Sequence, residues 1–135
     1  MTHIFPLRVY YEDTDLAGIV YYANYLKFIE RARSTMVLDA GIDQLEMQRD
    51  GFVFAVKRVE ADYINSARLN DDLRVETGLQ DLTGAKVVFV QDVYRGEWMI
   101  FSAKVTVVCI TNAGKIARFP AKIRAKLQDA ANSAS

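Results

Sequence analysis

The fold of this chain is decided by residues 9–33, which read VYYEDTDLAGIVYYANYLKFIERAR. The segment begins as a short β-strand, breaks into a turn over residues 13–18 and continues in a helical pattern. Gly18 suits the turn because glycine adopts backbone angles that residues with a Cβ avoid. Asp13 and Asp15 can accept hydrogen bonds from neighbouring backbone amides. The sequence therefore predicts a strand, a tight turn and a helix N-terminus in immediate succession.

The turn brings carboxylates next to the start of the helix. The first N–H groups of a helix have no intrahelical acceptor, and the helix dipole is positive at that end. Such a position can bind an anion or polarise a carbonyl group. The spacing alone leaves two interpretations: Asp13 and Asp15 only stabilise the turn, or one of them takes part in chemistry beside the helix.

Working outward, the remaining patterns predict one α+β domain over residues 1–135. Apolar residues recur at helical spacing from Tyr25 to Met36, and Gly41 ends a helix expected over residues 23–40. Alternating apolar residues predict antiparallel strands at residues 7–12, 52–64, 73–80, 86–94 and 98–111. We also expect short helices at 44–49 and 121–127 and a frayed tail at 130–135.

The face patterns of two strands carry further expectations. In the strand at 52–64, one face is expected to hold Val53, Ala55, Val59, Ala61 and Tyr63. The strand at 98–111 is apolar on both faces, and its second face includes Ile100, Val108 and Ile110. Because a strand buried on one side alternates more cleanly with polar residues, we expect part of that second face to meet another subunit. The sequence thus predicts a homo-oligomer.

Composition excludes several classes of function. Lys and Arg together number 17, as do Asp and Glu, so no overall positive field suggests nucleic acid binding. The single cysteine, Cys109, cannot form an internal disulfide, which fits a reducing compartment. The N-terminus lacks the apolar core of a signal peptide, and no apolar run approaches the roughly 20 residues of a membrane span. We expect a cytoplasmic protein without a membrane span.

The reactive side chains point to a carboxylate. The one histidine, His3, lies near a terminus that we expect to be mobile, so a catalytic triad, a Cys–His pair or a zinc site has no suitable imidazole. Cys109 lies in an apolar run and is expected to be a buried strand residue. An ionised carboxylate is a weak base and nucleophile, so it needs a reactive electrophile such as a thioester. Each N–H donor to the oxyanion is worth on the order of 3 kcal/mol.

Residues 11–25, YEDTDLAGIVYYANY, resemble the signature of hotdog-fold thioesterases. These form the 4-hydroxybenzoyl-CoA thioesterase family, which includes the YbgC-type acyl-CoA thioesterases associated with the Tol–Pal system. The resemblance continues through residues 28–33 (FIERAR) and 62–73 (DYINSARLNDDL) and covers about residues 7–127. It implies a hotdog fold, in which a five-stranded antiparallel sheet wraps around one long helix.

The resemblance also implies a site. It identifies Asp15 as the catalytic aspartate, acting as nucleophile or as base on water, and the backbone amide of Tyr22 as the group that polarises the carbonyl. Candidate substrate contacts are Gly18, Val20, Tyr63 and Lys86, of which Lys86 could hold coenzyme A phosphates. Tyr63 could instead be a core residue. No metal or cofactor is expected, because coenzyme A is part of the substrate.

The chain departs from its relatives at one position. Many YbgC-type members carry a histidine where this chain has Tyr22, so Tyr22 could serve only as a pocket wall. Glu30 matches a position where the benzoyl branch carries an acidic residue for its substrate's hydroxyl, but an intrahelical contact with Arg33 or Ser34 is the favoured interpretation.

Two functions therefore remain open. One is a thioesterase acting on acyl-CoA or acyl carrier protein; the other is a non-catalytic hotdog module that binds acyl chains or docks on enzymes of lipid synthesis. The resemblance further implies dimers whose sheets join edge to edge, with a tetramer favoured over a dimer.

Overall fold

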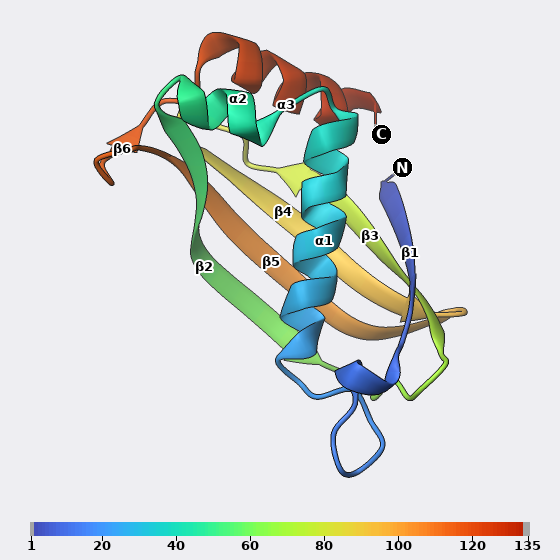
Figure 1. Ribbon diagram of the computed structural model, residues 1–135. Coiled ribbons are helices and arrows are strands. Elements are labelled where there is room, and N and C mark those ends of the chain that lie inside the picture. Colours follow the sequence, from blue (N-terminus) through green and yellow to red (C-terminus); the bar gives the residue numbers. More distant parts are fainter. Residues whose placement is uncertain (1, 134–135) are drawn as a thin grey trace.

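A curved antiparallel sheet wraps around one long helix, α1, in the computed structural model, which describes residues 2–133 (Figure 1). Five strands follow the order β1-β3-β4-β5-β2, and a sixth, β6, pairs with β5. The strands are β1 (His3–Arg8), β2 (Phe52–Tyr63), β3 (Asp72–Gln80), β4 (Lys86–Arg95), β5 (Trp98–Thr111) and β6 (Ile116–Ala117). The helices are α1 (Asn24–Asp39), α2 (Gln44–Arg49) and α3 (Ala121–Ser133), with a single 3₁₀ turn at Tyr11–Asp13. The α+β prediction is confirmed, with six strands rather than five.

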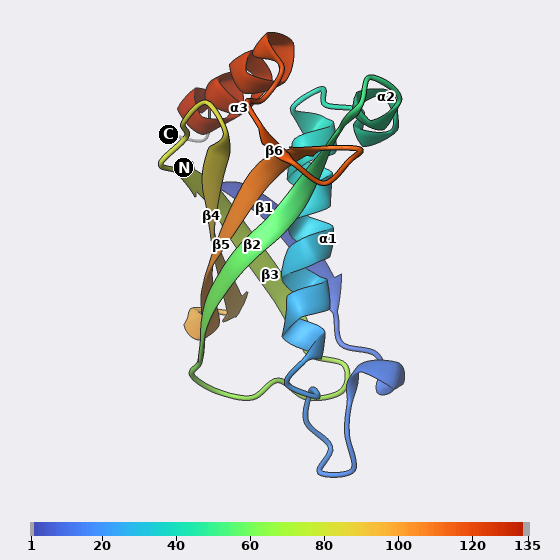
Figure 2. The ribbon, with the colours of Figure 1, turned by 90° about the vertical axis from the view of Figure 1, so that its left-hand side faces the viewer.

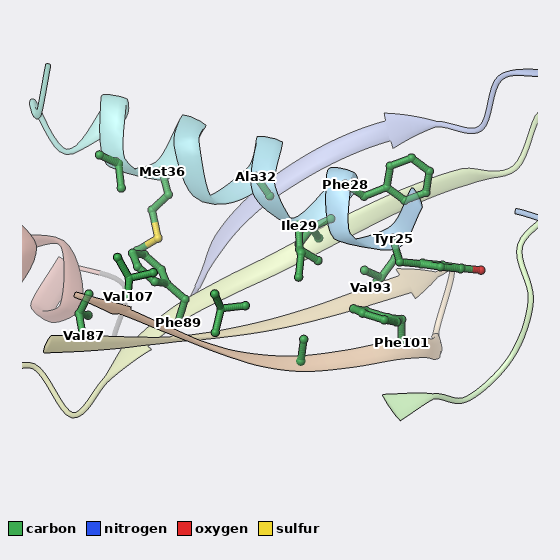
Figure 3. Packing of buried hydrophobic residues seen from close by; sticks show 14 of the residues in the cluster. Tyr25, Phe28, Ile29, Ala32, Met36, Val87, Phe89, Val93, Phe101 and Val107 are labelled. Atoms are coloured by element: carbon green, nitrogen blue, oxygen red, sulfur yellow. The ribbon is translucent and has the colours of Figure 1, made fainter. Parts of the chain in front are cut away.

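The core lies between α1 and the concave face of the sheet. Residues spaced three and four apart on α1, including Tyr25, Ile29 and Met36, are buried against the sheet. Figure 3 shows the ring of Tyr25 lying on Phe101 of β5, with the ring centroids 5.1 Å apart. This packing fixes the start of α1 against the sheet.

The first strand differs from the prediction. It spans His3–Arg8 rather than residues 7–12, and Pro6 is tolerated because β1 is an edge strand of the sheet. The expected mobility of His3 is wrong: His3 pairs with Thr77 of β3, and its Nε2 lies 2.9 Å from Oδ2 of Asp39 at the end of α1.

A β-bulge between Val56 and Arg58 overturns the predicted face of β2. Val59, Ala61 and Tyr63 pair with the inward-facing Val105, Ala103 and Phe101 of β5. Before the bulge, Phe52 and Phe54 take the inward positions instead, and both pack against the core. Val53 and Ala55 therefore lie on the opposite face, because one extra residue reverses the alternation.

Two further expectations need correction. Helix α3 continues to Ser133, so residues 130–133 are helical rather than frayed, and residues 134–135 lie outside the described part of the chain. Part of the second face of β5 was expected to meet another subunit, but two of its three named residues, Ile100 and Val108, are already buried by this chain itself. In the part of the chain that is described, no helix is long and apolar enough to cross a membrane.

Candidate active site

The turn that carries Asp15 projects beyond the end of the sheet, beside the start of α1 (Figures 1 and 2). The N–H of Asp15 donates to the carbonyl of Ile19 at 2.9 Å, and the N–H of Gly18 donates to the carbonyl of Asp15 at 3.0 Å. Gly18 has φ of +79°, as predicted for a turn glycine. The exposed Asp15 carboxylate accepts one hydrogen bond through Oδ1, from the N–H of Ala17 at 2.9 Å. Its second oxygen is thus available for chemistry.

Asp13 stabilises the turn through hydrogen bonds of its buried carboxylate and of its backbone carbonyl. Its buried carboxylate accepts a hydrogen bond from the N–H of Tyr10 at 2.9 Å. Its backbone carbonyl accepts from the N–H of Tyr21 and from the Asn24 side-chain amide, both at 2.9 Å. This network ties the turn to the first residue of α1. Of the two aspartates, Asp13 therefore has the structural role.

The N-terminus of α1 keeps open hydrogen-bond donors. Ala23, the residue before the helix, provides no side-chain cap, and the first turn of α1 contains no acidic residue. Within residues 2–133, the backbone N–H of Tyr22 donates to no protein acceptor. An unused N–H at a positive helix end can stabilise a negative oxygen. The exposed ring of Tyr22 leaves this end of the helix open on one side.

Asp15 and Tyr22 line one hollow of about 440 Å³. Its wall is formed by Asp15, Ile19, Val20, Tyr22, Tyr25, Tyr63, Ile64, Asn65 and Ser66. The hydroxyl of Tyr63 donates to the carbonyl of Tyr22 at 3.0 Å, so Tyr63 lies at the hollow and contacts the start of α1. Val20 is buried, and its N–H donates to the carbonyl of Ala67 at 2.8 Å. Val20 therefore forms the floor of the hollow.

Several residues of this hollow were missed by sequence reasoning. The hydroxyl of Tyr25 accepts a hydrogen bond from the N–H of Ala67 at 3.1 Å. Arg95 donates to the carbonyl of Ser66 at 2.6 Å and thereby holds the loop after β2. These contacts join segments distant in sequence, and no local pattern reveals them. The buried position of Tyr25 was the only signal, because its hydroxyl needs a partner there.

Other sequence candidates lie away from this hollow. Lys86 begins β4 and pairs with Val108, whereas Phe101, next to the hollow, lies at the other end of β5. Within one chain, Lys86 is thus not brought to Asp15. Glu30 accepts a hydrogen bond from the hydroxyl of Ser34 at 2.8 Å, which confirms the intrahelical interpretation. Cys109 is buried in β5, as predicted.

Residues 9–127 match the family described as the thioesterase-like superfamily. The chain belongs to this family. Acyl-CoA thioesterase YbgC of Haemophilus influenzae is 40% identical over 124 residues, which are 90% of each chain. Acyl-CoA thioester hydrolase YbgC of Escherichia coli is 38% identical over 106 residues, 78% of this chain and 79% of that protein.

The fold comparison agrees with the sequence comparison. The crystal structure of a probable thioesterase from Bartonella henselae aligns with a TM-score of 0.83 and 34% identity, and the alignment covers 89% of this chain and 100% of that chain. The predicted resemblance to hotdog thioesterases of the YbgC type is confirmed, and with it the class of enzyme, a thioester hydrolase.

Proposed function

We propose that this protein hydrolyses acyl-CoA thioesters in the hollow beside the start of α1, with Asp15 as the reacting carboxylate. The observation that carries this proposal is that the exposed Asp15 and Tyr22 line the same hollow, and that the Tyr22 N–H, just before α1, has no protein acceptor within residues 2–133. The Tyr22 N–H would donate to the thioester oxygen and stabilise the oxyanion as it forms. The acyl-CoA substrates named for the relatives from Haemophilus influenzae and Escherichia coli support the same reaction.

Two routes reach the same products. If Asp15 is the base, it takes a proton from water, the resulting hydroxide attacks the carbonyl carbon, and the thiolate of coenzyme A leaves and takes up that proton. If Asp15 is the nucleophile, its oxygen displaces the thiolate to form a mixed anhydride, which water then hydrolyses to restore Asp15. After a single turnover in H₂¹⁸O, label in Asp15 demonstrates the anhydride route, with attack of water on the aspartyl carbon. The base route leaves Asp15 unlabelled, as does attack of water on the acyl carbon of the anhydride, so trapping of the anhydride with hydroxylamine completes the test.

Coenzyme A enters as part of the substrate, and we propose no separate cofactor. An acyl carrier protein is a second candidate acyl donor. The proposed location is the cytoplasm, and the relationship to YbgC proteins makes an association with the Tol–Pal system a proposal to be tested by co-purification. Thiol release from acyl-CoAs from acetyl to palmitoyl, together with benzoyl types, tests the proposed activity. Release from none of them would contradict it.

We also propose a homo-oligomer, with a tetramer in preference to a dimer as the resemblance implies; the exposed side of β2 supports self-association. This strand forms one edge of the sheet, so one row of its N–H and C=O groups is unpaired. On its inner face Val56, Val59 and Tyr63 are 50%, 42% and 48% exposed, because α1 does not cover them. A second copy placed along this edge would pair with these backbone groups and would lie beside that inner face. Light scattering tests this proposal, since a fully active species of 15.3 kDa would contradict it.

The alternative is a module that binds acyl chains without turnover. One observation favours it: Tyr22 stands where many relatives of the YbgC type have a histidine, so no imidazole assists water at the hollow. The two functions differ in the thiol-release assay. Saturable binding of an acyl-CoA without thiol release would support the module.

A further inference from the structure

A second hollow, of about 230 Å³, lies between α1 and β2. Glu30, Arg33 and Ser34 line it from α1, and Phe54, Val56 and Phe89 line it from the sheet. The three residues from the sheet are apolar, whereas α1 contributes the half-buried guanidinium of Arg33. The hollow therefore combines apolar walls with one cation, Arg33, and one carboxylate, Glu30.

Within residues 2–133, the Arg33 guanidinium forms no ion pair. Its Nη1 donates to Oε1 of Gln91 at 3.0 Å, and its Cζ lies 6.0 Å from the ring centroid of Phe89. In the described chain no carboxylate lies within ion-pairing distance of Arg33. Burial lowers the pKa of Arg33, and the Glu30 carboxylate only partly opposes this. Glu30 is itself exposed and accepts a hydrogen bond from Ser34. Arg33 thus retains donors for a further acceptor.

Gln91 holds the guanidinium in a fixed position. This buried side chain uses its Nε2 to donate to the carbonyl of Ile29 at 2.7 Å and to the hydroxyl of Thr77 at 3.0 Å. Its oxygen is thereby left facing Arg33. A guanidinium that is already oriented loses less conformational entropy when it binds an anion.

The hollow lies along the same side of α1 as the reaction site. Leu26, Glu30 and Arg33 are spaced four and three residues apart, so they share one helix face. On the inner face of β2, Val56 lines the second hollow and Tyr63 lines the first. From Asn24 to Arg33 the helix rises about 14 Å, and because Gln91 also contacts Ile29, the guanidinium lies about one turn closer to the site. The distance along α1 from its start to the guanidinium therefore matches the length of an extended acyl chain of moderate length.

We propose, on the basis of the function proposed above, that Arg33 is a specificity-determining residue that binds a carboxylate at the far end of the acyl group. The preferred substrates are then coenzyme A thioesters of dicarboxylic acids. Their distal carboxylate would pair with the half-buried guanidinium through charge-assisted hydrogen bonds. An acyl chain of the same length that ends in a methyl group would leave that guanidinium unpaired beside apolar side chains.

The test compares acyl-CoAs of equal length that differ only at the far end: glutaryl with pentanoyl, adipoyl with hexanoyl, and suberoyl with octanoyl. We expect the wild-type kcat/KM to favour the dicarboxylic member of at least one pair by about 10- to 100-fold, the usual contribution of a hydrogen bond to a charged group. Arg33→Met should abolish that preference while still cleaving the methyl-ended member. The matched control is Arg31→Met, which removes an exposed cation from the same helix and should keep the preference.

Because Arg33→Met leaves the Gln91 oxygen without its donor, a second variant and a binding measurement accompany it. Arg33→Lys keeps the cation but loses the planar fork, and it should reduce the preference without abolishing it. Calorimetric titration with adipate and hexanoate needs no turnover, so it separates this inference from the proposed function. Adipate binding that is lost in Arg33→Met supports the inference even if no acyl-CoA is hydrolysed. Equal kcat/KM within every pair, or adipate binding unchanged in folded Arg33→Met, would overturn it.

Discussion

Removing the Tyr63 hydroxyl tests how the start of α1 is held. This hydroxyl donates to the carbonyl of Tyr22 at 3.0 Å, directly beside the N–H proposed to bind the oxyanion. The ring of Tyr63 also contacts Tyr22, Tyr25 and Phe101, with centroids 6.0, 5.7 and 5.0 Å away. Burial raises the pKa of Tyr63, so the hydroxyl remains a donor across the neutral range. Tyr63→Phe therefore removes one hydrogen bond and keeps the ring contacts.

The expected size of the effect follows from that single bond. A neutral hydrogen bond contributes about 0.5–1.5 kcal/mol, and the half-exposed position of Tyr63 places it towards the lower end. We expect kcat to fall about two- to fivefold with KM unchanged, because a less fixed N–H weakens transition-state binding rather than ground-state binding. Thiol release under steady-state conditions measures both constants. Tyr11→Phe, at an exposed tyrosine, is the control and should leave both unchanged.

Two results would refute this reasoning. A wild-type kcat in Tyr63→Phe would show that the hydroxyl does not position the start of α1. A rise in KM with unchanged kcat would show that the Tyr63 hydroxyl stabilises the bound substrate and the transition state equally, and that it has no positioning role.

Three further predictions concern the turn and the core. Asp13→Asn should keep most of the activity, because the amide oxygen can still accept the Tyr10 N–H; a loss as deep as that of Asp15→Asn would contradict this. Gly18→Ala should lower the unfolding free energy by about 1–2 kcal/mol in urea, since φ is +79° while no atom lies within 4 Å of the added Cβ. Cys109 should react with iodoacetamide only after unfolding, because burial raises the pKa of its thiol and keeps the thiolate scarce at neutral pH; rapid labelling of the native protein would contradict this.

Local patterns predicted most of the fold. The spans of α2 and β5 agree with the expected residues 44–49 and 98–111, and α1 differs from its expected range by one residue at each end. The turn before α1 was also readable, because Gly18 and the aspartates act on backbone within a few residues of themselves. These features depend on interactions that are close in sequence.

The rest depends on pairing between distant segments. The bulge after Val56 reversed the faces of β2, and nothing in its own alternation indicates the extra residue. His3 is held by its pairing with β3 and by its contact with Asp39 of α1. The same limit applies to the second hollow, where Arg33 of α1 meets Gln91 of β4. Local sequence reasoning treats such a residue as a surface charge, whereas its burial is decided by tertiary packing.

The most direct test of the account is the turnover of Asp15→Asn. The substitution preserves size and can preserve the hydrogen bond from the N–H of Ala17, but it removes the charge that either route requires. We expect acyl-CoA hydrolysis to fall about 10²-fold or more, while the thermal unfolding temperature and acyl-CoA binding stay close to those of the wild type. Turnover near the wild-type value in the purified variant would contradict the assignment of Asp15 as the reacting carboxylate.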